Sequence, residues 1–149
     1  MTIAIDCSDT PDPRDVQAVD DGLDASNHAA VDLRAVQPLG VYARDAAGTV
    51  VGGVLARSWG RAAEIQQLWV RADLRRQGIG RRLLQVAEAR LQARGCVTVY
   101  LDTFSWQAPA LYRACGYAVA AQIDGLPDGG VKYLMRKQLG PTADSDAAR

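Results

Sequence analysis

The segment Arg75–Arg82, which reads RRQGIGRR, combines two glycines with four arginines and could bind an anion. Gly78 and Gly80 lack a Cβ atom, so an anion can approach the backbone closely at both positions. If a helix begins here, its first unpaired N–H groups point at the same anion. Arg71 adds a fifth positive charge just upstream. The segment therefore predicts a binding site for a phosphate or pyrophosphate.

The residues on either side of this segment predict a strand and a helix. Glu64–Val70 is rich in β-branched and aromatic residues, which are typical of a strand. After the glycines, apolar residues recur at helical spacing until Gly95: Leu83, Leu84, Ala87 and Leu91. The phosphate turn is therefore expected between a strand and the N-terminus of a helix.

Two other phosphate-binding patterns fit this segment less well. A P-loop needs a Lys-Ser/Thr pair after its glycines, and this chain has Arg81-Arg82 there. A dinucleotide-binding turn is the closer rival, because Asp102 stands about twenty residues after the glycines, where such folds place a ribose-binding acid. Against it, Leu83 replaces the third small residue, and the charged stretch Arg71–Gln77 separates the strand from the glycines.

The pattern Arg75-x-x-Gly78-x-Gly80 resembles the signature loop of the GNAT superfamily of N-acetyltransferases. A second motif, Ser105–Tyr117 (SWQAPALYRACGY), resembles a later segment of the same family, in which an alanine is followed four residues on by a tyrosine and then by a Gly-aromatic pair. Both motifs occur in the family's order and at about its separation. The resemblance extends from about Val41 to Leu139.

This resemblance implies acetyl-coenzyme A as co-substrate, with no metal. The pyrophosphate would lie on the backbone of the turn, and the pantetheine arm would enter between two splayed parallel strands. Ser105 departs from the family, which often has an asparagine there; a serine still donates one hydrogen bond, or the contact moves to Gln107. The residues expected to bind the coenzyme are Leu68, Trp69, Val70, Arg75, Arg76, Gln77, Gly78, Ile79, Gly80, Arg81 and Ser105.

Two residues are candidates for the chemistry of acetyl transfer. Tyr112 corresponds to the family's phenol near the coenzyme sulfur, and its ordinary pKa near 10 leaves it able to donate a proton; the alternative is a core tyrosine on an amphipathic helix. Glu64 opens the strand on which some relatives carry a catalytic base; the alternative is a surface carboxylate near Arg61. Strand alternation would place Glu64, Gln66 and Leu68 on one side. Trp69 and Trp106 could line an acceptor cleft, but core positions are favoured.

The expected fold class is α/β, in the sense of an α+β mixed sheet. A strand–helix–strand centre should be right-handed, which makes its two strands parallel. The resemblance implies a GNAT-like fold: a central, mostly antiparallel sheet with a splayed parallel pair and helices on both faces. One domain is expected over residues 1–139, with a disordered tail over 140–149. The predicted strands are Thr2–Cys7, Leu39–Arg44, Val50–Ser58, Glu64–Val70, Cys96–Thr103, Tyr117–Ile123 and Val131–Gln138, and further helices are predicted at Arg14–His28 and Ala108–Ala114.

Composition and charge indicate which binding partners and which cellular location to expect. The 17 basic and 17 acidic residues balance, so nothing suggests nucleic acid. The chain shows no signal peptide and no apolar run of membrane length, so a cytoplasmic protein with reduced thiols and no membrane partner is expected. Asp12–Asp32 is strongly acidic, which favours a cationic acceptor if it borders the cleft. The sequence also leaves a homodimer open.

The function predicted from these patterns is N-acetylation. An acetyl group would pass from acetyl-coenzyme A to a primary amine of a small molecule or peptide, by direct attack in a ternary complex. Two alternatives remain from other classes: a catalytically silent acyl-coenzyme A-binding module, and a nucleotide-binding regulatory module.

Overall fold

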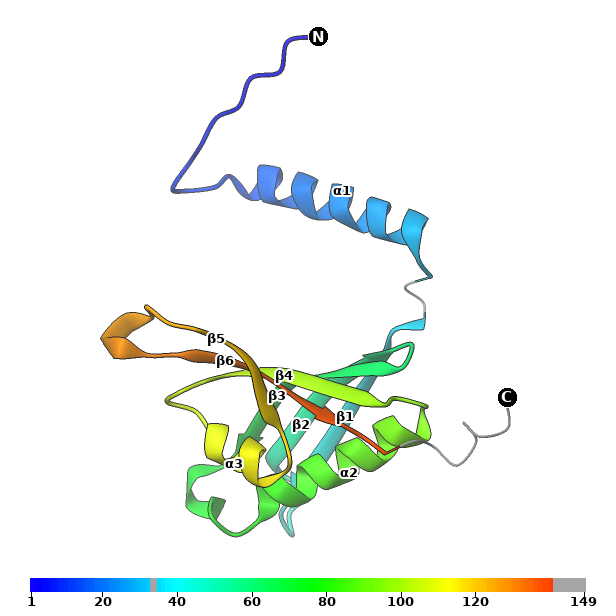
Figure 1. Ribbon diagram of the computed structural model, residues 1–149, viewed down its shortest axis with the longest axis vertical. Coiled ribbons are helices and arrows are strands. Elements are labelled where there is room, and N and C mark those ends of the chain that lie inside the picture. Colours follow the sequence, from blue (N-terminus) through cyan, green and yellow to red (C-terminus); the bar gives the residue numbers. More distant parts are fainter. Residues whose placement is uncertain (33–34, 141–149) are drawn as a thin grey trace. The chain divides into compact units, whose positions relative to one another are not determined.

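The computed structural model describes residues 1–32 and 35–140, so the predicted tail lies outside the described residues except for Gly140. The chain divides into two compact units, Met1–Ala35 and Val36–Arg149, each of which is described by itself (Figure 1). The single domain expected over residues 1–139 stays a prediction.

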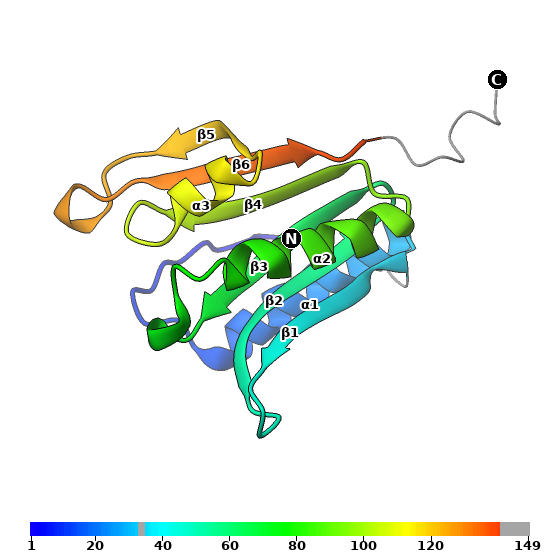
Figure 2. The same ribbon diagram turned by 90° about the horizontal axis from the view of Figure 1, so that it is seen from below.

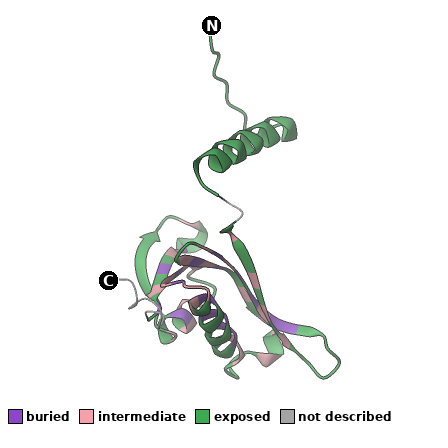
Figure 3. Ribbon diagram, turned by 90° about the vertical axis from the view of Figure 1, so that its right-hand side faces the viewer, coloured by how far each residue is buried: buried purple, intermediate pink, exposed green. Residues whose placement is uncertain are grey.

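The first unit contains one helix, α1, at Pro13–Ala30. Its start follows from sequence, because Pro13 occupies the first turn and the Asp12 carboxylate accepts a hydrogen bond from the Arg14 N–H at 2.8 Å. The predicted helix at Arg14–His28 is confirmed, and Figure 3 shows it exposed along its length. The predicted strand at Thr2–Cys7 is wrong: these residues are exposed and pair with no strand of the described chain.

The second unit is built on a six-stranded sheet with the order β1-β2-β3-β4-β6-β5. Every neighbouring pair is antiparallel except β3 and β4, which run parallel. The mixed, mostly antiparallel sheet expected from sequence is therefore confirmed. The strands are β1 at Gln37–Arg44, β2 at Val50–Trp59, β3 at Ala62–Val70, β4 at Thr98–Phe104, β5 at Ala118–Ile123 and β6 at Lys132–Gln138.

The parallel pair separates after three residues. Ala62–Glu64 of β3 pairs with Thr98–Tyr100 of β4, and the remainder of each strand has no partner in the other. The splay implied by the family resemblance is confirmed. It leaves the β3 backbone from Ile65 to Val70 unpaired on its β4 side, where another extended chain could bond to it.

A bulge in β3 changes which side chains share a face. Leu55 and Ala56 of β2 oppose Gln67 and Ile65, so Gln66 is an extra residue in β3. The expected grouping of Glu64 with Gln66 and Leu68 is therefore wrong, because the extra residue shifts the alternation by one. Ile65 and Leu68 both pack on the core, whereas Gln67 is exposed.

Two helices lie on one face of the sheet, the face turned to the viewer in Figure 2: α2 at Ile79–Ala93 and α3 at Pro109–Ala114. The apolar stripe of α2 predicted from its spacing is buried against the sheet, and Leu84 and Leu91 are fully buried. Burying a leucine stabilises the fold by about 1.5–3 kcal/mol, so this stripe fixes the helix firmly. Two short 3-10 helices complete the unit, η2 at Ala72–Leu74 and η3 at Pro127–Gly129.

A buried ion pair with an added hydrogen bond connects α2 to the sheet. Glu88 of α2, buried, accepts a hydrogen bond from the Tyr117 hydroxyl at 2.9 Å and pairs with the Lys137 ammonium at 2.7 Å. Burial, and next the Glu88 charge, raise the pKa of Tyr117 above its usual range. The bridge joins α2 to the segment after α3 and to β6.

Candidate active site

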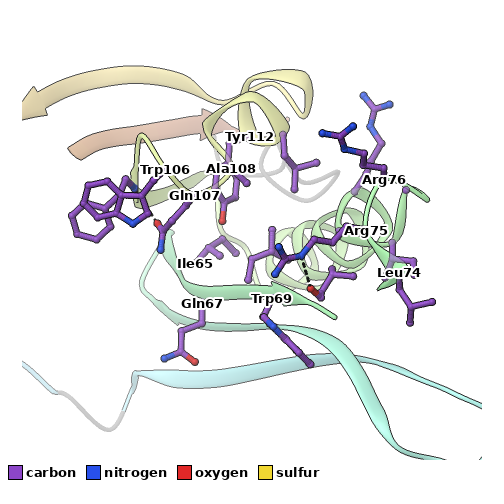
Figure 4. A pocket seen from close by; sticks show the side chains of 18 of the residues that line it. Ile65, Gln67, Trp69, Leu74, Arg75, Arg76, Trp106, Gln107, Ala108 and Tyr112 are labelled. Atoms are coloured by element: carbon purple, nitrogen blue, oxygen red, sulfur yellow. Dashed lines mark hydrogen bonds between the residues drawn. The ribbon is translucent and has the colours of Figure 1, made fainter. Parts of the chain in front are cut away.

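A cavity of about 890 Å³ opens where β3 and β4 separate (Figure 4). Its walls come from β3 beyond Glu64, the end of β4, the turn before α2, and α3. Its volume lies within the usual range for a small-molecule or cofactor site. The splayed strands thus create the space, and the two helix ends close it.

The predicted phosphate turn forms one end of this cavity. Gly78, at the N-cap of α2, has φ +77°, a left-handed conformation that favours glycine. The first N–H groups of α2, at Ile79, Gly80 and Arg81, have no intrahelical acceptor and are available to an anion. Arg76 also has a positive φ, +60°, an uncommon conformation for a side chain of this size. The local backbone therefore has the positive φ angles and the unpaired N–H groups that the predicted phosphate turn requires.

The arginines of the turn have different surroundings. Arg75 donates to the Val70 carbonyl at 2.9 Å, the dashed line in Figure 4, and Arg81 donates to the Ala114 carbonyl at 2.9 Å. Arg71 is paired with Asp73 at 2.7 Å. Arg76 lines the cavity, and its guanidinium has no partner among the residues that the structure describes. Arg75 and Arg81 therefore hold the turn in place, and Arg76 is free to meet a ligand.

Gly80 is needed for packing as much as for access. A Cβ at this position would lie 3.2 Å from Leu111 Cδ2 and 3.8 Å from Val70 Cγ2. The α2 N-terminus thus approaches α3 and the end of β3 closely, which a larger side chain would prevent.

Tyr112 lines the cavity from α3 and is buried, with 7% of its surface exposed. Its ring makes an edge-to-face contact with Tyr117, with centroids 5.9 Å apart. Within residues 1–32 and 35–140 its hydroxyl has no hydrogen-bond partner. Burial raises the pKa of Tyr112 to about 12, so the phenol is protonated at neutral pH. It is an available proton donor inside the cavity.

Comparison with known proteins identifies the family. A model described as the Acetyltransferase (GNAT) family matches residues 4–117. The chain belongs to the GNAT acetyltransferase family. It is similar to a blasticidin-S acetyltransferase of Streptomyces morookaense, with 36% identity over 107 residues that cover 69% of this chain and 79% of that protein.

Solved structures share the same GNAT fold. The crystal structure of an acetyltransferase described as putative, from Agrobacterium tumefaciens, matches with a TM-score of 0.78 and 27% identity over 92% of this chain and 100% of that one. An aminoglycoside 6'-N-acetyltransferase complexed with coenzyme A matches with a TM-score of 0.62 and 22% identity, over 72% of this chain and 76% of that one. At this lower identity the second match supports the fold alone.

Most of the residues expected to bind coenzyme A in this GNAT chain line the cavity. The lining includes Leu68, Trp69, Val70, Arg75, Arg76, Gly78, Ile79, Gly80, Arg81 and Tyr112. Three of the predicted residues do not belong to it: Glu64, Gln77 and Ser105. The sequence motifs therefore identify the turn and the phenol, but they do not outline the whole site.

The three residues outside the lining have other contacts. Arg57 Nε donates to Glu64 Oε2 at 2.7 Å, which leaves Oε1 without a hydrogen bond in the described chain. The Ser105 hydroxyl accepts from the Val131 N–H at 3.1 Å. Gln77 donates weakly to the Asp73 carbonyl at 3.4 Å. The coenzyme and catalytic roles of these residues stay predictions.

The sequence motifs left out some residues of the cavity wall, such as Leu74 and Phe104, and misjudged others. Trp69 was expected to bind the coenzyme, and core positions were favoured for both Trp69 and Trp106; they are 50% and 60% exposed, so the core expectation is wrong. The sequence suggested Asp102 only as the ribose-binding acid of a dinucleotide site. Its place in the cavity wall follows from the separation of β3 and β4, which the sequence of β4 alone does not reveal. Gln107 lines the cavity, and its Oε1 accepts from Thr103 and from the Phe104 N–H. Its amide nitrogen is therefore a donor that could replace the family's asparagine.

No group of three or more His, Cys, Asp or Glu side chains suited to a metal occurs among the residues described. In the same part of the chain, no helix has the length and apolar character needed to cross a membrane.

Proposed function

We propose that this GNAT protein transfers an acetyl group from acetyl-coenzyme A to a primary amine of a small molecule. The observation that carries the proposal is one cavity with an anion-binding turn at one end and a buried, unpartnered phenol, Tyr112, in its wall. Both features match what acetyl transfer from a coenzyme thioester requires.

The coenzyme would be held mainly by backbone. The N–H groups at the start of α2 face the pyrophosphate, and Arg76 adds a charge-assisted contact. The pantetheine amides can pair with the β3 edge at Leu68–Val70, which β4 leaves unpaired. A protein with the same fold is described as complexed with coenzyme A, so the fold is compatible with this assignment.

The chemistry is a direct attack in a ternary complex. A neutral amine nitrogen bonds to the thioester carbon, the C–S bond breaks, and the departing sulfur takes a proton from the Tyr112 hydroxyl. The new amide nitrogen then loses its extra proton, which returns to the Tyr112 oxygen through solvent. Unpaired N–H groups of β3 are available to the carbonyl oxygen as negative charge develops on it.

The attacking ammonium must lose its proton first, because an aliphatic amine has a pKa near 10. Glu64 is the proposed acceptor of that proton, through water, since only one of its carboxylate oxygens is bound by Arg57. Glu64 is not itself in the cavity wall, so a relay by water is required in this account.

One relative supports a small-molecule acceptor over a peptide. It is 36% identical to this chain and is named for acetylating blasticidin-S. The proposed acceptor class is therefore amine-bearing antibiotics and similar small amines.

The test combines binding with turnover. Calorimetry should show acetyl-coenzyme A binding that NAD and ATP do not match, and thiol release should depend on an added amine. Binding of acetyl-coenzyme A without thiol release on any amine of a broad panel would indicate a silent acyl-coenzyme A-binding module. Preference for NAD or ATP would indicate a nucleotide-binding regulatory module instead.

A further inference from the structure

The cavity has a strong asymmetry of charge. Arg75, Arg76 and Arg81 line the end at the phosphate turn. Among the described lining residues Asp102 is the sole acidic side chain. It lies two residues beyond Tyr100, the last residue of β4 that pairs with β3, and is thus close to the point where the strands part. The coenzyme occupies the basic end in the proposed function, so Asp102 is left for the acceptor.

The cavity that Asp102 lines also has exposed aromatic side chains in its wall. Trp69 and Trp106 both line the cavity while 50% and 60% of their surfaces remain exposed. Phe104 stacks on Trp106 with ring centroids 4.6 Å apart and planes 5° apart, which holds the indole in place. Large exposed indoles at a cavity suit a ligand with a planar or cationic group. None of these three rings is needed to hold the phosphates.

The protein already places an ammonium group at this position. Lys132 Nζ lies 3.3 Å from Asp102 Oδ2 and 5.5 Å from the centre of the Phe104 ring. A carboxylate and an aromatic face together bind the ammonium of this lysine, as they would bind one carried by a ligand. The Asp102 and Lys132 side chains are 50% and 34% exposed, so solvent and ligands can reach the pair.

We propose that Asp102, Trp69 and Trp106 form an acceptor subsite that selects amines carrying a second positive charge on a planar body. This inference rests on the proposed function. The attacking nitrogen must be neutral, so a carboxylate cannot favour that nitrogen as an ammonium; it recognises a second charged group instead. The ligand's cation competes with Lys132 for Asp102, and its planar body lies against the indoles.

The test uses three benzylamines that differ only in the para group: aminomethyl, methyl or carboxylate. For wild-type protein, kcat/KM should fall in that order. Asp102→Asn should lower kcat/KM for the aminomethyl compound by about twofold to fivefold, a range suited to a solvent-exposed charge contact, and should leave the methyl compound nearly unchanged. Lys132→Met should raise kcat/KM for the aminomethyl compound, because it removes the cation that competes for Asp102.

This opposite sign separates recognition from structure. If the Asp102–Lys132 pair only stabilised the fold, both variants would lower activity together and would lower the unfolding temperature. If Asp102 acted as a general base, Asp102→Asn would lower kcat for all three amines. Either result would overturn the inference, as would equal kcat/KM values for the three amines in the wild-type protein.

Binding provides a second measurement that does not need turnover. Calorimetry of the three amines on protein saturated with coenzyme A should show the same order and the same opposite shifts in the two variants. Trp106→Leu should weaken all three benzylamines but not pentane-1,5-diamine, which has no ring. If the wild-type protein does not bind acetyl-coenzyme A, the proposed function is refuted. If it does, but the two variants bind the three amines with the same relative affinities as the wild type, this subsite alone is refuted.

Discussion

Tyr112 keeps its proton at neutral pH at the position proposed for the general acid. The phenol is buried and unpartnered in the described chain, and burial raises its pKa to about 12. A phenol that remains protonated at neutral pH can donate to a thiolate but cannot act as a base. An ordinary phenol, with a pKa near 10, is also protonated at neutral pH, so the placement of Tyr112 in the cavity wall carries its proposed role, and burial only makes it a weaker acid.

Tyr112→Phe is expected to lower kcat by about two to four orders of magnitude, the usual value of general acid catalysis, with coenzyme A affinity almost unchanged. Steady-state kinetics and calorimetry measure the two quantities separately. Tyr42→Phe removes an exposed phenol of β1 outside the cavity and provides the control. Full activity in the Tyr112 variant would mean that the thiolate leaves unaided or takes its proton from water.

The phosphate turn is expected to bind through its backbone more than through its arginines. Arg76→Ala should weaken acetyl-coenzyme A by about 1 kcal/mol or less, because an exposed charge contributes little. Gly80→Val should weaken it far more, because the new side chain meets Leu111 and Val70 and displaces the α2 N-terminus. Calorimetry on both variants gives the comparison; a larger loss from Arg76→Ala would contradict the backbone account.

At the scale of elements, the bridge at Glu88 connects the helices to the sheet. It joins α2 to β6 through Lys137 and to the segment after α3 through Tyr117. Tyr117 in turn contacts the ring of Tyr112. The bridge therefore supports the element that carries the proposed acid.

Glu88→Ala should reduce the free energy of unfolding by about 1–3 kcal/mol, because it leaves a buried phenol and a partly buried ammonium without their acceptor. Glu88→Gln retains an oxygen that can accept from Tyr117 and should cost less. Urea unfolding of the two variants measures the difference. Equal losses would show that the negative charge paired with Lys137, which both variants lack, is what Glu88 contributes.

For the whole molecule, two buried phenols predict loss of stability at alkaline pH. Burial raises the pKa of Tyr112 to about 12 and raises that of Tyr117 as well. In the unfolded chain both phenols ionise near pH 10, so above that pH the unfolded state binds fewer protons than the native state. The free energy of unfolding should therefore fall as pH rises from about 10, by about 2 kcal/mol for Tyr112 once pH reaches about 12.

Urea unfolding at pH 8, 10 and 11 measures this dependence. Tyr112→Phe should show a smaller decrease above pH 10, because it lacks one of the two phenols. An identical decrease in the variant and the wild type would mean that Tyr112 ionises as readily in the folded protein as in the unfolded chain.

The amino-acid sequence by itself determined the features that depend on neighbouring residues. The turn at Gly78 needs a residue that tolerates positive φ, α2 follows from its apolar stripe, and Tyr112 follows from a motif contained within Ser105–Tyr117. Each of these is set by contacts a few positions apart. The pattern in the sequence is then enough to locate them.

The rest of the site depends on contacts between segments far apart in the sequence. The bulge at Gln66 depends on how β3 meets β2, and the parting after Glu64 depends on how β3 meets β4. Those two non-local pairings bring Asp102 to the cavity wall and leave Trp69 exposed there. Strand register is set by pairing partners far away in sequence, and one inserted residue reverses which side chains face the core. The sequence of β3 alone predicts side chains that alternate strictly between the two faces of the sheet. The pairing of β3 with β2 shows that this alternation is interrupted at Gln66.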